Sequence, residues 1–221
     1  MNKNNKWVFN NNVGLKGGGK DELNKWMKEH VKEYSSIPEK NAEAIRRYTS
    51  GKYRLYNEKL RAGRMTKNIM ESLKEVVDSM RALPDYSGEV YRGSVMSKSV
   101  LKEIKVGDVI FDPAFLSTSV DKPAALKFLT SSSTSKDNIK YLMTIDAKRG
   151  KSLMDRGLSS FAVEEAEVLL LPKTPREVTK IEYKGPDVYI YGKEVDAIGQ
   201  SARNIFTGEV KVIDEAPGTV K

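Results

Sequence analysis

The chain has 221 residues, of which 39% are hydrophobic, enough for one large domain or two small ones with an ordinary core. It contains no cysteine, which excludes disulfides, thiolate nucleophiles and thiolate zinc sites. It contains one histidine, His30, which leaves almost no room for histidine triads or multi-histidine metal sites. Any catalysis must therefore come from carboxylates, hydroxyls and cationic side chains.

The net charge is +8, and residues 1–90 hold most of it, with 18 Lys and Arg against 12 Asp and Glu. Such a balance indicates an anionic partner (nucleic acid, an acidic protein surface or a phosphate-bearing ligand), although solubility alone also explains it. No stretch approaches the roughly 18 apolar residues of a membrane helix. Residues 1–20 are polar, rich in Gly and Asn, and lack the apolar run of a signal peptide, so we expect a flexible tail and a cytoplasmic location.

Residues 21–87 have the apolar periodicity of helices. Ser36 and Pro38 are typical of a helix start, Thr66 is a candidate cap, and Gly63 is a helix stop. Pro84 and residues 85–88 have the composition of a turn. The predicted helices cover residues 21–34, 38–48, 52–61 and 66–83.

After Gly88 the pattern changes to short strands separated by turns. The sequence therefore predicts an α+β fold in one domain, residues 21–221, with a helical N-terminal layer (21–87) packed on a mixed or antiparallel β sandwich (88–221). The candidate strands are 89–92, 108–111, 115–119, 140–146, 166–171, 178–183, 188–191 and 209–213, and one short helix is expected at 121–129.

The first segment with chemical potential is Arg92-Gly93, at the end of a predicted strand. A guanidinium there offers a rigid donor fork for a phosphate. A following glycine lets a ligand approach the backbone closely. A surface arginine before a turn is the simpler alternative.

The second segment is Ser117-Thr118-Ser119, three hydroxyl residues at another strand end. Hydroxyls placed in this way can orient neighbouring side chains by hydrogen bonds. A strand with a polar exit explains the same residues without any function.

The third segment contains Glu165 and Glu167 at the start of an apolar strand. Strand side chains alternate, so positions two apart point to the same face, and two carboxylates would then share one cleft. Like charges that close raise the pKa of one partner, as is common where acid–base chemistry or cation stabilisation takes place. A solvated acidic patch is the alternative.

The order of the three segments resembles the Arg-Ser-Glu class of mono-ADP-ribosyltransferases, over roughly residues 40–185. This family includes the enzymatic chains of actin-modifying binary toxins, vertebrate arginine-specific ectoenzymes and phage proteins. The resemblance implies an ADP-ribosyltransferase fold, NAD⁺ as substrate, and no metal.

The actin-modifying branch supplies two further matches. Its helical pattern of Tyr, Tyr, Asn and Leu-Arg before the arginine strand is similar to Tyr48, Tyr53, Asn57 and Leu60-Arg61 here. Its phenylalanine that meets the nicotinamide corresponds to Phe128. These residues are therefore expected to bind NAD⁺, together with Arg92, Gly93, Ser117, Thr118, Ser119 and Glu167.

Two positions depart from the family pattern. Where some toxins carry a second phosphate-binding arginine, this chain has Ser131, so Arg61 or a nearby lysine is expected to compensate. The aromatic before the paired glutamates, Phe161, stands four residues ahead of Glu165 instead of three. The extra acidic residue, Glu164, leaves the register of this loop open.

The resemblance also implies roles. Glu167 is expected to stabilise the cation that forms when nicotinamide leaves, and Ser117 to hold the Glu167 carboxylate. Arg92 is expected to bind the phosphates of NAD⁺. Glu165 is expected to face the acceptor. Family members that modify arginine carry Glu at this last position, while those that modify asparagine or guanine usually carry Gln. A protein target with an accessible arginine is therefore the expected partner.

Two other hypotheses remain open from the sequence. Nucleic acid as acceptor is favoured by the strongly basic segment 52–67, and a catalytically dead NAD-binding module on the same fold is possible. With one catalytic domain and no signal peptide, we expect a monomer that acts in the cytoplasm of an intoxicated or phage-infected cell.

Overall fold

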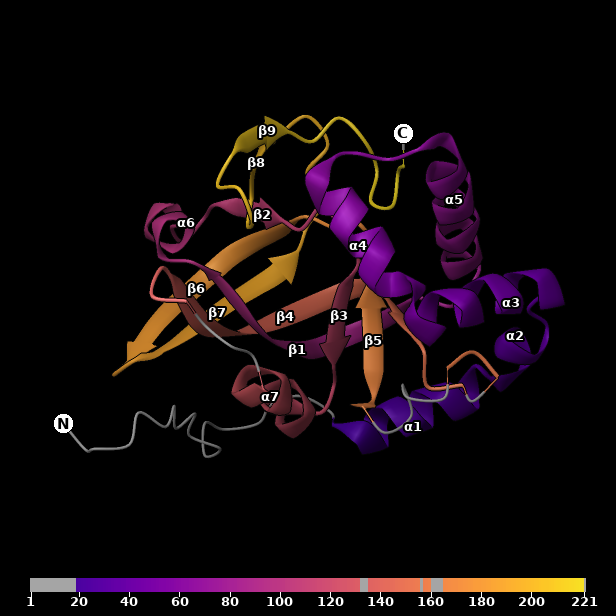
Figure 1. Cartoon of the computed structure of the whole chain (residues 1–221). Helices are drawn as coiled ribbons and strands as arrows, with labels where there is room; N and C mark the ends of the chain where they lie inside the picture. Colours follow the sequence, from indigo (N-terminus) through magenta and orange to yellow (C-terminus); the bar gives the residue numbers. More distant parts are fainter. Residues whose placement is uncertain (1–18, 132–134, 156, 160–164, 221) are drawn as a thin grey trace.

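The computed structural model describes residues 19–131, 135–155, 157–159 and 165–220. Helices from the N-terminal part lie beside strands formed by the rest of the chain, which confirms the predicted α+β class (Figure 1). Most of the tail predicted for residues 1–20, up to residue 18, lies outside the described residues; the first helix begins at Lys20.

The first predicted helix, 21–34, is divided in two. His30 has φ −106° and ψ 14°, which are not helical, and its Nδ1–H donates to the Trp26 carbonyl at 2.8 Å. The imidazole also stacks on the Trp26 ring. The helical elements of this layer are α1 (Lys20–Glu29), α2 (Val31–Ser35), α3 (Glu39–Arg47), the π-helical turn η1 (Tyr48–Lys52), α4 (Tyr53–Ala62) and α5 (Lys67–Arg81).

The turn η1 joins α3 to α4 and redirects the chain. Gly51 within it has φ 130°, a conformation that side-chain-bearing residues rarely adopt. Thr66 caps α5 as predicted, because its Oγ1 accepts the Ile69 N–H.

The predicted turn at residues 85–88 is wrong, because the first strand already begins at Tyr86. Tyr86 is buried and packs edge-on against Trp26 of α1, so tertiary packing overrides the local turn composition. The strands are β1 (Tyr86–Ser97), β2 (Val109–Phe111), β3 (Leu116–Ser119), β4 (Asn138–Ser152), β5 (Glu167–Leu170), β6 (Arg176–Lys184), β7 (Asp187–Glu194), β8 (Ser201–Asn204) and β9 (Val210–Val212).

Two short elements were not predicted from the sequence. Helix α6 (Lys98–Glu103) is too short to show a helical period, and its signal is the cap in which Ser97 Oγ accepts the Ser99 N–H. Strand β8 lacks an apolar alternation, since Ala202 is its only buried hydrophobic residue. The second helix of the β-rich part, α7 (Lys122–Ser131), falls where a helix was expected.

The strands are joined in the order β1-β3-β5-β4-β7-β6-β2-β8-β9, with a further pairing of β1 to β4. Most pairs are antiparallel, while β4–β7 and β2–β8 are parallel, so the sheet is mixed. In Figure 1, β3 and β5 run across the direction of β1 and β4, beside α4. Strand β3 contacts β1 at one edge and β5 at the other, which brings Arg92, Ser117 and Glu167 onto neighbouring strands.

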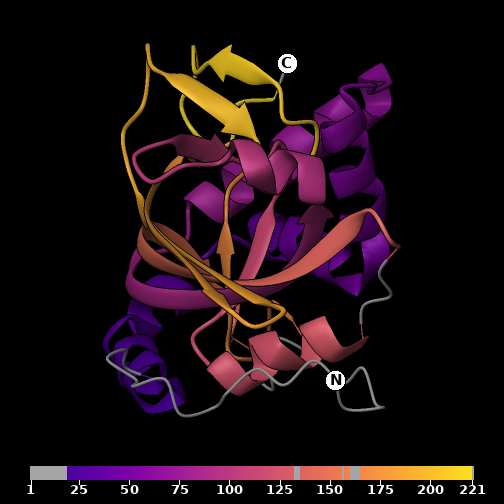
Figure 2. The ribbon, with the colours of Figure 1, turned by 90° about the vertical axis from the view of Figure 1, so that its left-hand side faces the viewer.

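The hydrophobic core has two main parts. One lies among the strands and includes Val90, Ile145 and Val168, and the other joins α2–α5 to β5 and includes Tyr48, Leu73 and Leu169. Figure 2 shows α7 at one end of the molecule and the β8–β9 hairpin at the other. Helix α7 packs on β1 and thereby forms one wall of the site.

Candidate active site

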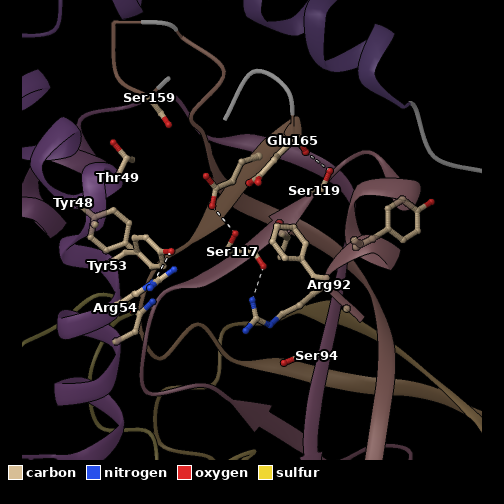
Figure 3. A pocket seen from close by; sticks show the side chains of 18 of the residues that line it. Tyr48, Thr49, Tyr53, Arg54, Arg92, Ser94, Ser117, Ser119, Ser159 and Glu165 are labelled. Atoms are coloured by element: carbon tan, nitrogen blue, oxygen red, sulfur yellow. Dashed lines mark hydrogen bonds between the residues drawn. The ribbon is translucent and has the colours of Figure 1, made fainter. Parts of the chain in front are cut away.

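A cavity of about 770 Å³ lies between η1 and α4 on one side and β1, β3 and α7 on the other (Figure 3). The structure brings almost all of the predicted site residues to it. Those that line the cavity are Tyr48, Tyr53, Asn57, Arg92, Gly93, Ser117, Thr118, Ser119, Phe128, Glu165 and Glu167.

Arg92 projects from the middle of β1, where it pairs with Met143 of β4. Its Nη1 donates to the Ser117 carbonyl at 2.7 Å, which fixes the guanidinium against β3. Its Nε is buried and has no hydrogen-bond partner among the described residues. A fixed guanidinium with donors to spare is suited to hold a phosphate.

The three hydroxyls of β3 have separate partners on the β5 side. Ser117 Oγ donates to Glu167 Oε1 at 2.5 Å, Thr118 Oγ1 donates to the Val168 carbonyl, and Ser119 Oγ donates to the Glu165 carbonyl at 2.5 Å. Ser117 therefore orients a carboxylate, while the other two hold the backbone that carries the carboxylates.

Glu165 and Glu167 both line the cavity, but not through strand alternation as predicted. Strand β5 begins only at Glu167, and Ala166 between them has φ 47°. This left-handed conformation is costly for a residue with a side chain, and the surroundings must hold it. The buried Ala166 side chain and the Val120 N–H, which donates to the Ala166 carbonyl, hold the turn in place.

The environment of Glu167 disfavours its charged form. Burial, with a further contribution from the nearby Glu165 charge, raises the pKa of Glu167 to about 7. The Ser117 hydrogen bond and the Arg92 charge oppose this shift. A desolvated carboxylate that titrates near neutrality is typical of a functional site.

Aromatic rings stand on both sides of the cavity. Tyr53 of α4 and Phe128 of α7 are 37% and 44% exposed, respectively. Tyr48 is buried against Phe115, and burial strongly raises the pKa of its hydroxyl, so this residue stays neutral. The flat apolar surfaces of the exposed rings suit a planar heterocycle.

Gly93 is required by the packing of α7 on β1. A Cβ at this position would lie 2.2 Å from the Ala125 carbonyl oxygen and 2.6 Å from Leu129 Cγ. The glycine therefore lets α7 approach β1 directly. The close approach predicted for a ligand is thus made by a helix of the protein itself.

Gly93→Ala is expected to destabilise the fold by about 1–3 kcal/mol, because the added methyl must push the α7 backbone outward. Urea denaturation measures this change. Gly19→Ala is the matched control: its Cβ meets nothing within 4 Å, so it loses only the preference for Gly over Ala at the N-cap of α1, below about 1 kcal/mol. Equal midpoints for the two variants would contradict the tight packing of α7 on β1.

Arg61 is not among the residues that line the cavity. Its guanidinium forms two hydrogen bonds with the buried Asp112, at 3.0 and 3.3 Å, and lies 4.2 Å from the Phe206 ring centroid. Asn57 lines the cavity and also accepts the Phe115 N–H through its Oδ1, which ties α4 to the start of β3.

Several residues that line the cavity were not predicted from the sequence. Arg54 is the charged one, and the basic segment 52–67 was the signal that could have found it. Phe161 and Glu164, which bear on the register of the preceding loop, lie outside the described residues. The other lining residues not predicted are Thr49, Ser50, Gly51, Tyr91, Ser94, Val95, Ala125 and Ser159.

No group of three or more metal-binding side chains occurs within the described part of the chain. Among the described helices, none is both long and apolar enough to cross a membrane.

An arginine, a serine that holds a glutamate, and a second glutamate at one cleft are the arrangement that defines the Arg-Ser-Glu transferases. The family model described as ADP-ribosyltransferase exoenzyme matches residues 23–191, so the chain belongs to this family of NAD⁺-dependent enzymes.

Named relatives agree with this assignment. The chain is 30% identical over 186 residues to the putative NAD⁺–arginine ADP-ribosyltransferase Vis of Vibrio splendidus (strain 12B01), covering 80% of this chain and 74% of that protein. It is 31% identical over 151 residues to the NAD⁺–protein-arginine ADP-ribosyltransferase Tre1 of Serratia proteamaculans (strain 568), covering 67% of this chain and 30% of that protein. The crystal structure of Vis with agmatine superposes with a TM-score of 0.74 at 28% identity, covering 87% of this chain and 91% of that one.

Proposed function

We propose that this enzyme transfers ADP-ribose from NAD⁺ to an arginine side chain of a target protein, and hydrolyses NAD⁺ as a side reaction. The observation that carries the proposal is the Glu167 carboxylate, which Ser117 holds in the same cavity as Arg92 and Glu165. The experiment that tests it is incubation with NAD⁺ and agmatine, a small guanidinium compound, followed by measurement of nicotinamide and of the adduct.

The first half of the reaction breaks the bond between nicotinamide and ribose C1′. Nicotinamide leaves with the bonding electron pair, and positive charge develops on the sugar. The fixed Glu167 carboxylate stabilises that charge, because it is already oriented by Ser117 and needs no rearrangement. Arg92, fixed by its bond to the Ser117 carbonyl, holds the phosphates.

The second half joins C1′ to a nitrogen of the acceptor. A guanidinium has a pKa above about 12 and is a poor nucleophile while protonated. Glu165 lines the same cavity and would orient the guanidinium and accept its proton as the new bond forms. When water replaces the guanidinium, the products are free ADP-ribose and a proton.

The activity should depend on pH through Glu167, because only its carboxylate form stabilises the cation. With a pKa of about 7, the rate of NAD⁺ hydrolysis at low NAD⁺ should fall roughly tenfold per pH unit below that value and level off above it. Ser117→Ala removes a hydrogen bond that favours the charged form, so its profile should shift to higher pH. A rate that stays constant from pH 5 to pH 8 would contradict this assignment.

Nucleic acid is the second candidate acceptor, and the segment 52–67 favours it. Incubation with labelled NAD⁺ and either protein, RNA or DNA separates the two acceptors. The cationic side chains of this segment are Lys52, Arg54, Lys59, Arg61, Arg64 and Lys67, against the single carboxylate of Glu58.

The proposal also covers where and how the enzyme works, namely as a monomer in the cytoplasm of the cell it modifies. The monomer is supported by the cavity, which is lined by residues from several elements of this one chain. Light scattering of the purified protein measures its mass in solution. The mass of a dimer would overturn the monomer.

A further inference from the structure

The cavity has two guanidinium groups on opposite walls. Arg92 extends from β1, and Arg54 extends from α4. In Figure 3 the Arg92 head group points toward the wall that carries Arg54, and Glu165 lies higher in the view, beside Ser119.

The Arg54 side chain is positioned by Tyr53, but no described carboxylate balances its charge. Its Nε donates to the Tyr53 hydroxyl at 3.0 Å, and its guanidinium carbon lies 5.7 Å from the centroid of the Tyr53 ring. In the described part of the chain, no carboxylate forms an ion pair with it. Its side chain is exposed, so its remaining donors can reach a ligand in the cavity.

Arg61, one turn further along α4 than Asn57, is differently engaged. Its two hydrogen bonds go to Asp112, whose side chain is 1% exposed. Moving Arg61 into the cavity would leave a buried carboxylate without its partner, which is strongly destabilising. Arg61 is therefore a structural residue in this arrangement and does not supply the cation that was expected of it.

We propose that Arg54 is the second cation for the pyrophosphate of NAD⁺, opposite Arg92. A pyrophosphate within a dinucleotide carries two negative charges on adjacent phosphates, and Arg92 supplies one positive charge. A second planar guanidinium on the facing wall matches the second phosphate in charge and in donor geometry. This inference rests on the proposed use of NAD⁺ and adds a binding residue to it.

Arg54→Gln tests the inference, with Arg64→Gln as matched control. Arg64 is exposed, lies in the same basic segment and does not line the cavity, so both variants lose one positive charge. The probe is ADP-ribose, which has the pyrophosphate but lacks nicotinamide, titrated by calorimetry beside NAD⁺. Arg54→Gln should weaken both ligands by the same factor, about tenfold to a hundredfold, while Arg64→Gln stays within twofold of the wild type.

Three outcomes would overturn the inference. The first is ADP-ribose affinity in Arg54→Gln within twofold of the wild type. The second is an equal loss of affinity in Arg54→Gln and Arg64→Gln, which would mean that only the overall positive charge of the segment matters. The third is a loss for NAD⁺ alone, which would place Arg54 at the nicotinamide. A wild-type protein that binds neither ligand contradicts the proposed function itself and is thereby distinguished.

Discussion

Glu167→Gln should lower the rate of nicotinamide release by about a hundredfold to a thousandfold, the usual loss when one preorganised electrostatic stabiliser is removed. The glutamine oxygen can still accept the Ser117 hydrogen bond, so the shape of the site is kept while the charge is removed. The assay is chromatographic measurement of nicotinamide at pH 8, where the wild-type carboxylate is ionised.

The stability of Glu167→Gln shows whether the variant is folded when its activity is measured. The pKa of Glu167 is about 7 in the folded protein, above the value of about 4.5 expected when it is unfolded. The folded state therefore binds more protons between these values, and the stability contributed by this group falls as pH rises through that window. At pH 8 Glu167→Gln should thus be more stable than the wild type, by about 1–3 kcal/mol. A folded variant with wild-type hydrolysis would remove Glu167 from the mechanism.

Glu165→Gln should separate the two halves of the reaction. Transfer to agmatine should fall by about a hundredfold or more, the range for loss of a general base, while hydrolysis without acceptor stays within about tenfold of the wild type. Water is small and needs less activation to trap a reactive cation. The Ser119 hydrogen bond goes to the Glu165 backbone carbonyl, so the substitution leaves the turn in place.

A second readout distinguishes this role from simple distortion. The Glu165 charge contributes to the raised pKa of Glu167, so its removal should shift the pH profile of hydrolysis to lower pH. Glu103→Gln, an exposed carboxylate on α6, is the control and should leave both activities and the profile unchanged. If transfer to agmatine survives in Glu165→Gln, Glu165 is not the base for the guanidinium. If both activities fall together, the assignment of Glu165 to the acceptor half alone is wrong.

Much of the site could be predicted from the sequence because its residues stand in short, recognisable strand segments, although Arg92 lies in the middle of β1 and not at the strand end that was predicted. Local patterns predicted strands around Arg92 and Ser117 but not that these strands are neighbours; the pairing of β3 with β1 and β5 brings both residues to Glu167. The pairing of Glu165 with Glu167 was predicted for the wrong reason, since a buried left-handed alanine produces it. Backbone conformation of that kind depends on tertiary packing, which the local pattern does not contain.

The roles of the cationic residues also depend on tertiary contacts that the local sequence does not contain. Arg54 and Arg61 belong to one basic segment, and the sequence does not say which faces the cavity. The choice is made by Asp112, which lies fifty-one residues further along the chain than Arg61 and binds it. Gly93 is similar, because α7, the helix whose close packing requires a glycine there, follows two strands later in the chain.

The most direct test of the central claim is mass spectrometry of the wild-type enzyme incubated with NAD⁺ and excess agmatine, with Glu167→Gln beside it. The claim is that Glu167 drives nicotinamide release and that the ADP-ribose passes to a guanidinium. Nicotinamide and ADP-ribosyl-agmatine should appear together in the wild-type reaction, and both should be reduced at least a hundredfold in the variant. Release of nicotinamide with free ADP-ribose as the only other product, or equal activity in the variant, would contradict the claim.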